Sequence, residues 1–223
     1  GTAYKEWDRY MSSNPYAASK AGGEELAYSY YNTYGLPVVI THTMNVFGER
    51  QHPEKFFPKV INAALQGEKI FIHSNPERTK AGSRFYVHAR NVCAAMLFLI
   101  AQHEKGVKII GDKFNIVGER EMDNITLAQF IAKAVGKELK YDLVDFHSSR
   151  PGHDLRYALD GTKLKDMGYA HPKTFEESLT KTVEWYVEHP EWLLADFSKA
   201  QFQKEAHAFD EGAKQMLKKV EAQ

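Results

Sequence analysis

Tyr16 and Lys20 stand four positions apart near the start of a segment with a helical pattern. Residues at this spacing share one face of a helix. A tyrosine is a weak base at neutral pH, since its ordinary pKa is about 10, but a neighbouring ammonium group favours the phenolate. The pair can therefore serve a hydroxyl-to-carbonyl oxidation, in which a proton leaves oxygen as hydride leaves carbon. A tyrosine packed on a sheet and a solvated lysine would give the same spacing.

The helix that carries the pair is predicted over residues 15–34. Asn14 is a good N-cap, Pro15 suits the first helical position, and Gly35 is the expected C-cap residue. Residues 36–44 are short, mostly apolar and β-branched, which indicates a strand buried on both faces. A helix followed by a buried strand is typical of a parallel α/β sheet.

The rest of the chain alternates between further helical and strand patterns. Helices are predicted at residues 56–66, 91–102, 126–135 and 175–189, and strands at 69–73, 84–87, 114–117 and 141–144. Two capping boxes, which begin at Thr126 and Thr174, mark the starts of the last two helices. Residues 191–223 are charged and alanine-rich, and they are expected to form a helical appendage.

Composition excludes several classes of partner. The chain has 223 residues with 29 basic and 29 acidic side chains, so its formal charge is zero and nucleic-acid binding is not expected. No apolar run approaches the roughly 18 residues of a membrane span. The single cysteine, Cys93, excludes an intrachain disulfide and favours a reducing, cytoplasmic compartment. No HxH or HExxH spacing occurs, so no metal site is expected.

The segment around Tyr16 is the first of a series of motifs. In chain order they are NPYAASKA at 14–21, YGLP at 34–37, NVFG at 45–48, HPEKFFP at 52–58, RFYVH at 84–88, FNIVG at 114–118 and RPGHDLRYALD at 150–160. The series resembles the extended short-chain dehydrogenase/reductases, the family of NAD-dependent nucleotide-sugar epimerases and dehydratases. The last motif is the most specific, because it is similar to the RPGHDRRYAID segment of dTDP-glucose 4,6-dehydratases.

The resemblance implies an α/β fold with a Rossmann-like parallel sheet, incomplete in this chain, and a smaller C-terminal α/β substrate domain. Residues 1–48 would be the C-terminal part of the NAD-binding domain. Residues 49–190 would form mainly the substrate domain, with 84–117 returning to the Rossmann sheet, and 191–223 would be a helical tail.

The chain contains no GxxGxxG motif, which in this family holds the pyrophosphate of NAD. We therefore expect completion by an N-terminal segment or another chain; a remnant that only binds nucleotide sugar is an alternative. The resemblance also implies a homodimer. The family usually dimerises through a four-helix contact that includes the tyrosine-bearing helix. The small residues Ala21, Gly22 and Gly23 would permit close approach there.

For the reacting end of the site, the resemblance implies that Tyr16 takes the proton from the sugar 4-hydroxyl. Lys20 would hold the nicotinamide ribose of NAD. Asn45 would lie near the nicotinamide and contact the substrate as well. The dehydratases of this family also use an Asp-Glu pair for elimination, upstream of the tyrosine; Glu6 and Asp8 occur there and are not assigned to catalysis.

For binding of the nucleotide, the resemblance implies a further set of residues between positions 54 and 153. They are Glu54, Lys55, Phe56, Phe71, Ile72, His73, Arg84, Arg150 and His153. The first three begin a helix whose free amides would meet the diphosphate, and the next three form a strand beside the nucleobase. Arg150 and His153 would clamp the nucleotide. Arg84 is the candidate phosphate arginine.

The Arg84 assignment has an alternative. Arg78 and Lys80, in the polar loop before Arg84, can supply the phosphate-binding charge instead. Asp154, Arg156 and Asp160 are favoured as a structural set of salt bridges and helix caps rather than as ligand contacts; these three residues belong to the last motif.

The implied reaction is a nucleotide-sugar 4,6-dehydration of the dTDP-glucose type. NAD takes hydride from C4, water is lost across C5 and C6, and hydride returns to C6. The alternatives are an NAD-dependent 4-epimerase or decarboxylase, and a non-catalytic nucleotide-sugar-binding subunit without its own cofactor site.

Overall fold

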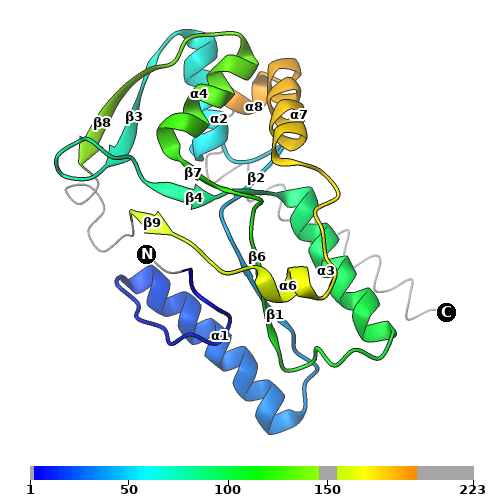
Figure 1. Ribbon diagram of the computed structural model, residues 1–223. Helices are drawn as coiled ribbons and strands as arrows, with labels where there is room; N and C mark the ends of the chain where they lie inside the picture. The colour runs from blue at the N-terminus through cyan, green and yellow to red at the C-terminus, as the bar shows by residue number, and fades with distance from the viewer. Residues whose placement is uncertain (1–2, 146–154, 195–223) are drawn as a thin grey trace.

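The computed structural model describes residues 3–145 and 155–194 of the chain. Figure 1 shows helices and strands in mixed order, with α1 at one end of the molecule and a group of helices, α2, α4, α7 and α8, at the other. The strands lie between them in small groups, most of which are parallel pairs. The expected α/β architecture is therefore confirmed.

Helix α1 spans Pro15–Tyr34, as its sequence signals predicted. The Asn14 side chain accepts a hydrogen bond from the Ala17 amide at 2.9 Å, and Gly35 ends the helix in the left-handed conformation. None of the residues in α1 is fully buried. The Tyr31 ring lies so near Gly111 that a Cβ there would come within 2.3 Å of it, which makes glycine necessary at this contact.

Strand β1 (Ile40–Thr43) pairs in parallel with β6 (Lys113–Ile116) between α1 and α3 (Ala89–Glu104) (Figure 1). The prediction of a strand over 36–44 buried on both faces is wrong in extent and burial, because β1 has four residues, all half-buried. The physical reason is that, in the described part of the chain, β1 has a strand neighbour on one edge only.

The outer edge of β6 is covered by side chains instead of a strand. The backbone amide of Asn115 donates a hydrogen bond to the Glu6 carboxylate at 3.1 Å. The Lys163 ammonium donates to the Lys113 carbonyl at 2.8 Å. These contacts satisfy backbone groups that would otherwise be left unpaired.

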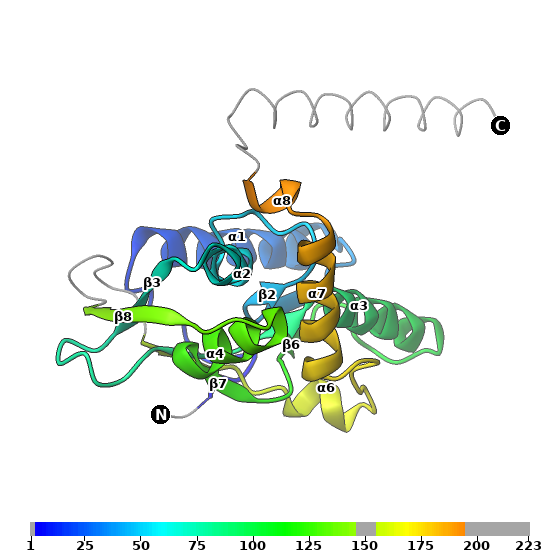
Figure 2. The same ribbon diagram turned by 90° about the horizontal axis from the view of Figure 1, so that it is seen from above.

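The remaining strands form three further groups. Strand β2 (Val46–Phe47) is parallel to β5 (Val87–His88), and β3 (Lys69–Ser74) is parallel to β8 (Lys140–Asp145). Strand β4 (Ser83–Phe85) lies between antiparallel β7 (Glu121–Asp123) and parallel β9 (Arg156–Tyr157). Figure 2 shows β3 and β8 side by side at the end of the molecule away from α3.

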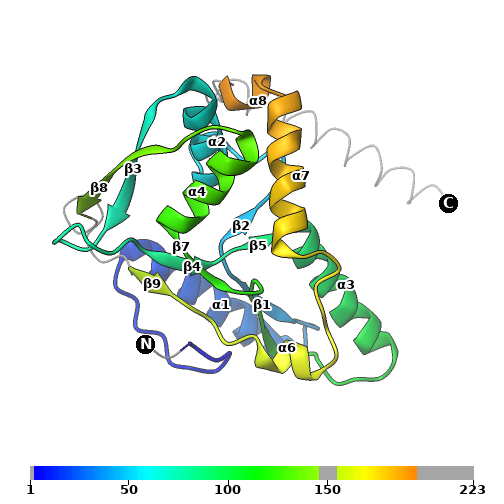
Figure 3. The same cartoon turned by 45° about the horizontal axis from the view of Figure 1, so that its top comes forward.

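The helices beyond β2 surround the larger apolar core. They are α2 (Phe56–Gln66), α4 (Asn124–Val135), α7 (Phe175–Glu188) and the short α8 (Glu191–Leu194). Figure 3 shows α4 beside α2 and α7. Phe47, Phe57, Ile131 and Tyr186 are fully buried among them. A second core around Phe114 and Ile116 of β6 includes Leu164 of the short helix α6 (Thr162–Asp166).

The start of α4 corrects one expectation. The predicted capping box at Thr126 is wrong, because Asp123 is the N-cap and α4 begins at Asn124. The Asp123 carboxylate accepts hydrogen bonds from the Ile125 and Thr126 amides at 3.0 and 2.9 Å, and Thr126 uses its hydroxyl to donate to Asp123 as well. The amides that Asp123 caps lie before or at Thr126, so the helix starts earlier than a cap at Thr126 would have set it. The predicted box at Thr174 is confirmed.

Asp123→Ala is expected to destabilise the protein by about 1 kcal/mol at neutral pH, the usual effect of losing an N-cap. Burial alone would raise the pKa of Asp123, but the hydrogen bonds from Thr126 and Ile125 hold that pKa below its ordinary value. The cap therefore stabilises the fold above the ordinary Asp pKa of about 4, and its contribution is lost as pH falls through the folded-state pKa.

Urea unfolding of wild type and Asp123→Ala at neutral and acidic pH measures this effect. The difference between the two proteins should shrink on acidification. Glu138→Ala, a change at an exposed residue just after the same helix, is the control and should unfold like wild type at both pH values. A constant difference across pH would show that Asp123 does not act through its charge.

Candidate active site

Tyr16 and Lys20 lie in the first two turns of α1 with their side chains in solvent. Tyr16 is 70% exposed. In residues 3–145 and 155–194, no hydrogen bond joins the two side chains, which lie four residues apart on one helix. The exposed placement leaves both groups open to a ligand, and the pairing that the spacing predicted stays a prediction.

Asn45 lies two residues after the end of β1 and is exposed. Its carbonyl accepts a hydrogen bond from the Val87 amide at 3.0 Å, which ties this position to β5. Helix α1 and β1 run in opposite directions, so the start of α1 and the carboxyl end of β1 lie toward the same end of the pair (Figure 1). Ligands in open α/β sheets bind beyond the carboxyl ends of the strands, and Tyr16, Lys20 and Asn45 all lie at that end.

The start of α2 lies in the segment that follows Asn45. Lys55 is the N-cap residue and makes no side-chain capping bond, and both Glu54 and Lys55 are exposed. Phe56 is half-buried, with its ring stacked near that of Tyr86. The first amides of a helix lack internal partners and attract anions. No described side chain caps this end of α2, so the amides at Phe56 and Phe57 have no capping partner, whereas Pro58 has no amide hydrogen. The Lys55 ammonium adds positive charge.

The three residues proposed to bind the nucleobase are consecutive on β3, but their side chains differ in exposure. Phe71 is 59% exposed, whereas Ile72 is fully buried in the larger core and His73 is half-buried. Side chains alternate between the two faces of a strand, so adjacent residues cannot all line one wall. Phe71 is the member of this set whose ring is free to stack on a ligand.

Arg84 is engaged in structural contacts. Its guanidinium donates to the Ser83 and Leu155 carbonyls at 2.6 and 2.7 Å, which joins β4 to the segment before β9. Arg78 and Lys80, the alternatives for phosphate binding, are exposed in the loop between β3 and β4.

The last motif lies partly outside the described residues, which is where Arg150, His153 and Asp154 fall. Arg156 donates to both carboxylate oxygens of Glu121 at 2.7 and 2.8 Å. Asp160 accepts a hydrogen bond from the Thr162 amide at the start of α6. The prediction that these residues form structural salt bridges and helix caps is therefore confirmed for Arg156 and Asp160.

Sequence reasoning missed a polar cluster between α1 and the β1–β6 pair. The Glu24 carboxylate contacts the Lys113 ammonium at 2.7 Å and the His42 ring at 2.8 Å. Lys113 is only 4% exposed, and its ammonium lies 4.4 Å from the centre of the Trp7 ring. Glu24 is one helical turn after Lys20, and the charged lysine at the start of an apolar strand was the signal that could have revealed the cluster.

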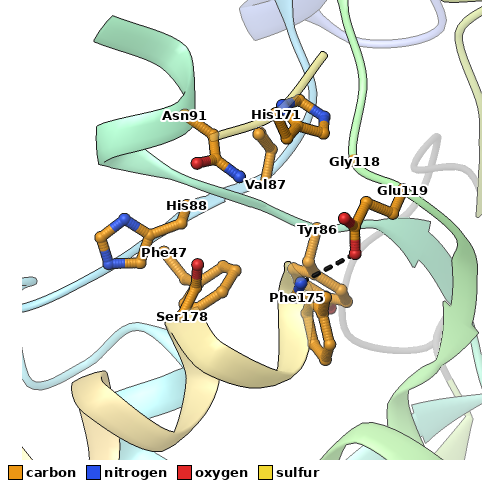
Figure 4. A pocket seen from close by; sticks show the side chains of 10 residues that line it. All are labelled: Phe47, Tyr86, Val87, His88, Asn91, Gly118, Glu119, His171, Phe175 and Ser178. Carbon is orange, nitrogen blue, oxygen red and sulfur yellow. Dashed lines mark hydrogen bonds between the residues drawn. The ribbon is translucent and has the colours of Figure 1, made fainter. Parts of the chain in front are cut away.

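A small cavity lies between α3, α7 and β5 (Figure 4). Its volume is about 10 Å³, the size that one water molecule needs. Two buried polar atoms at its wall, Asn91 Oδ1 and Ser178 Oγ, have no hydrogen-bond partner within the described residues. A nucleotide sugar cannot enter so small a space, so this cavity is not the substrate site.

We expect one ordered water in this cavity, because buried polar atoms in folded proteins are nearly always hydrogen-bonded. A high-resolution crystal structure should show it within hydrogen-bonding distance of Asn91 Oδ1 and Ser178 Oγ. Ser178→Ala should remove the water or leave it poorly ordered. An empty cavity in the wild-type protein would contradict the prediction.

Comparison with known proteins identifies the family. The model of the GDP-mannose 4,6 dehydratase family matches residues 1–182. The chain belongs to this family. Within it, the chain is 35% identical to the dTDP-glucose 4,6-dehydratase of Escherichia coli over 199 residues, which are 85% of this chain and 52% of that protein. It is 36% identical to a trifunctional UDP-glucose 4,6-dehydratase of Arabidopsis thaliana, over 84% of this chain and 26% of the plant protein.

Solved structures of family members agree with this assignment. A dTDP-glucose 4,6-dehydratase from Bacillus anthracis in complex with NAD superposes with a TM-score of 0.73 at 30% identity, over 86% of this chain and 58% of that one. The Streptomyces venezuelae dTDP-glucose 4,6-dehydratase gives the same TM-score at 32% identity, over 86% and 56%. The chain thus spans about half the length of its bacterial relatives. The predicted family resemblance is confirmed.

None of the helices in residues 3–145 and 155–194 is long and apolar enough to cross a membrane. No group of three metal-ligating side chains comes together within the same residues.

Proposed function

We propose that this chain carries the proton-transfer and substrate-binding part of an NAD-dependent nucleotide-sugar 4,6-dehydratase of the dTDP-glucose type. The observation that carries the proposal is the placement of Tyr16 and Lys20, both exposed in the first turns of α1, at the carboxyl end of β1. Asn45 and the uncapped start of α2 follow β1 along the chain. The likeness to dTDP-glucose 4,6-dehydratases supports the substrate class.

The described residues fit one end of the cofactor. NAD, when bound, would supply the hydride acceptor for C4 of the sugar and the hydride donor for C6. The Tyr16 phenolate would take the proton of the C4 hydroxyl and become the phenol, and the Lys20 ammonium would donate hydrogen bonds to the nicotinamide ribose. Asn45 orients the substrate beside them. No glycine-rich turn for the pyrophosphate occurs in the sequence, so these residues fit the nicotinamide end alone.

The nucleotide is held by groups that begin at α2. The free amides of the first turn and the Lys55 ammonium bind the diphosphate, because a helix N-terminus favours an anion. Phe71 stacks on the nucleobase, and Arg78 or Lys80 adds positive charge in the neighbouring loop. Arg150 and His153 keep their predicted role in clamping the nucleotide.

We propose the same domain bounds that the family resemblance implied. Residues 1–48 belong to the NAD-binding domain, 49–190 mainly to the substrate domain, and 84–117 return to the first sheet, a proposal that the β1–β6 pairing supports. Completion by a further segment beside β1, or a homodimer through α1, would cover the exposed side chains of α1, which include Leu26, Tyr30 and Tyr34. We also propose a cytoplasmic setting, since Cys93 is the single cysteine.

Incubation with dTDP-glucose and NAD tests the proposal. A dehydratase produces a 4-keto sugar, which develops a chromophore in alkali. A 4-epimerase would instead yield the C4 epimer without a lasting chromophore. A binding subunit would show nucleotide-sugar affinity by calorimetry with no affinity for NAD and no product. Either of the last two results would overturn the dehydratase assignment.

A further inference from the structure

Helix α1 is fastened to the β1–β6 pair by a carboxylate with three hydrogen-bonding partners. One oxygen of Glu24 contacts Lys113 at 2.7 Å and also accepts the hydroxyl hydrogen of Tyr10. The other oxygen contacts His42 Nε2 at 2.8 Å. Burial alone would raise the pKa of Glu24, but the hydrogen bonds from Lys113, Tyr10 and His42 hold that pKa below its ordinary value. Glu24 is therefore an ionised acceptor toward His42.

The second ring nitrogen of His42 also faces an acceptor. His42 Nδ1 lies 2.9 Å from Asn115 Oδ1. The orientation of this amide is fixed, because Asn115 Nδ2 donates to the carbonyls of Tyr4 and Asp160 at 3.1 and 2.9 Å. A carbonyl can only accept, so the nitrogen of the amide must point to those carbonyls and its oxygen to His42.

Both nitrogens of His42 must therefore donate, and an imidazole ring donates from both nitrogens only as the imidazolium. A neutral ring would place a lone pair against an acceptor oxygen on one side, at 2.8 or 2.9 Å. That contact would be repulsive and would weaken the link between α1 and β1.

The charged groups around His42 are paired. Glu24 of α1 contacts both Lys113 of β6 and His42 of β1, and the Glu6 carboxylate accepts a hydrogen bond from the backbone amide of the neighbouring Asn115. Asp112 and Lys163 form a separate pair at 2.6 Å beside them. Buried charges persist in proteins when they are paired and hydrogen-bonded, and this set meets that condition.

We propose that Glu24 and His42, the latter as an imidazolium, are positioning residues that seat α1 on the β1–β6 pair and so determine where Tyr16 and Lys20 stand. None of the side chains of α1 is fully buried, so this polar contact carries much of the attachment. Glu24 follows Lys20 by one turn and Tyr16 by two, which places it on the segment that must be held. The effect on catalysis rests on the proposed function, whereas the protonation of His42 does not.

Nitrogen-15 NMR of the full chain, labelled at histidine, tests the protonation. The His42 ring should show two protonated nitrogens at neutral pH, and Glu24→Gln should convert it to a neutral tautomer. His103, exposed near the end of α3, provides a reference signal in the same spectrum. A neutral His42 in the wild-type protein would overturn the proposal, and this reading does not require any variant to fold.

Turnover tests the positioning role. Glu24→Gln should lower kcat on the order of 10²-fold, because small misplacements of reacting groups have effects of that size, while KM for the nucleotide sugar changes little. Glu24→Asp should restore part of the loss. Glu25→Gln, a change at the exposed neighbour on α1, is the matched control and should keep wild-type kcat. Wild-type turnover in Glu24→Gln would refute the positioning role. Absence of turnover in a wild-type protein that binds both the nucleotide sugar and NAD would refute the proposed function and leave the NMR result intact.

Discussion

Tyr16→Phe is expected to lower turnover by roughly 10²- to 10⁴-fold, the usual contribution of a group that transfers a proton in the transition state. The substitution removes the phenolic oxygen that would accept the proton of the C4 hydroxyl and leaves the ring in place. Affinity for the nucleotide should be nearly unchanged, because the proposed diphosphate and nucleobase contacts lie at α2 and β3. The alkaline chromophore measures turnover, and calorimetry with dTDP measures affinity.

Tyr34→Phe is the matched control for this experiment. Tyr34 lies at the far end of the same helix and is 75% exposed. It loses the same hydroxyl without approaching the site, so its turnover should equal that of wild type. Full activity in Tyr16→Phe would remove Tyr16 from the mechanism, whatever the family resemblance implies.

Phe57→Ala is expected to destabilise the protein by about 3–5 kcal/mol, the range for truncating a buried aromatic side chain. Phe57 is 2% exposed, and its ring stacks on Phe47 with 4.2 Å between centroids. It also meets the edge of Tyr86 at 5.4 Å. The cavity left by the substitution would lie among α2, α7 and β2, which hold one side of the proposed diphosphate site.

Phe71→Ala provides the contrasting measurement. Its ring is exposed on β3, so the urea midpoint should hardly move, while affinity for the nucleotide sugar should fall because a stacking surface is lost. Equal losses of stability in Phe57→Ala and Phe71→Ala would contradict the assignment of Phe57 to the core and Phe71 to the site.

Local signals predicted most helices. Asn14 and Gly35 fixed the ends of α1, and Gly67 ended α2, because caps act through backbone groups within one turn. The short strands β7 and β9 were missed, since strands of two or three residues have no sequence period and exist through pairing with β4. Asp123 was missed as a cap because the threonine three residues later gave an equally strong local signal.

The residues of the candidate site also differ in whether the sequence alone could reveal them. Tyr16 and Lys20 are close in sequence, and the motif that joins them is readable without a structure. Glu24, His42 and Lys113 are separated by tens of residues, and only the packing of α1 on β1 and β6 brings them together. Ile72 is a different case, because the alternation of a strand could have shown that it faces away from Phe71.

Because the outer edge of β6 is covered, the β1–β6 sheet can gain a further strand only beside β1. With the Asn115 amide bound by Glu6 and the Lys113 carbonyl bound by Lys163, an additional strand cannot join there without displacing a salt-bridged side chain. Exposed sheet edges invite uncontrolled association, and proteins commonly block them with charge. Any polypeptide that enlarges this sheet must therefore arrive on the flank of β1.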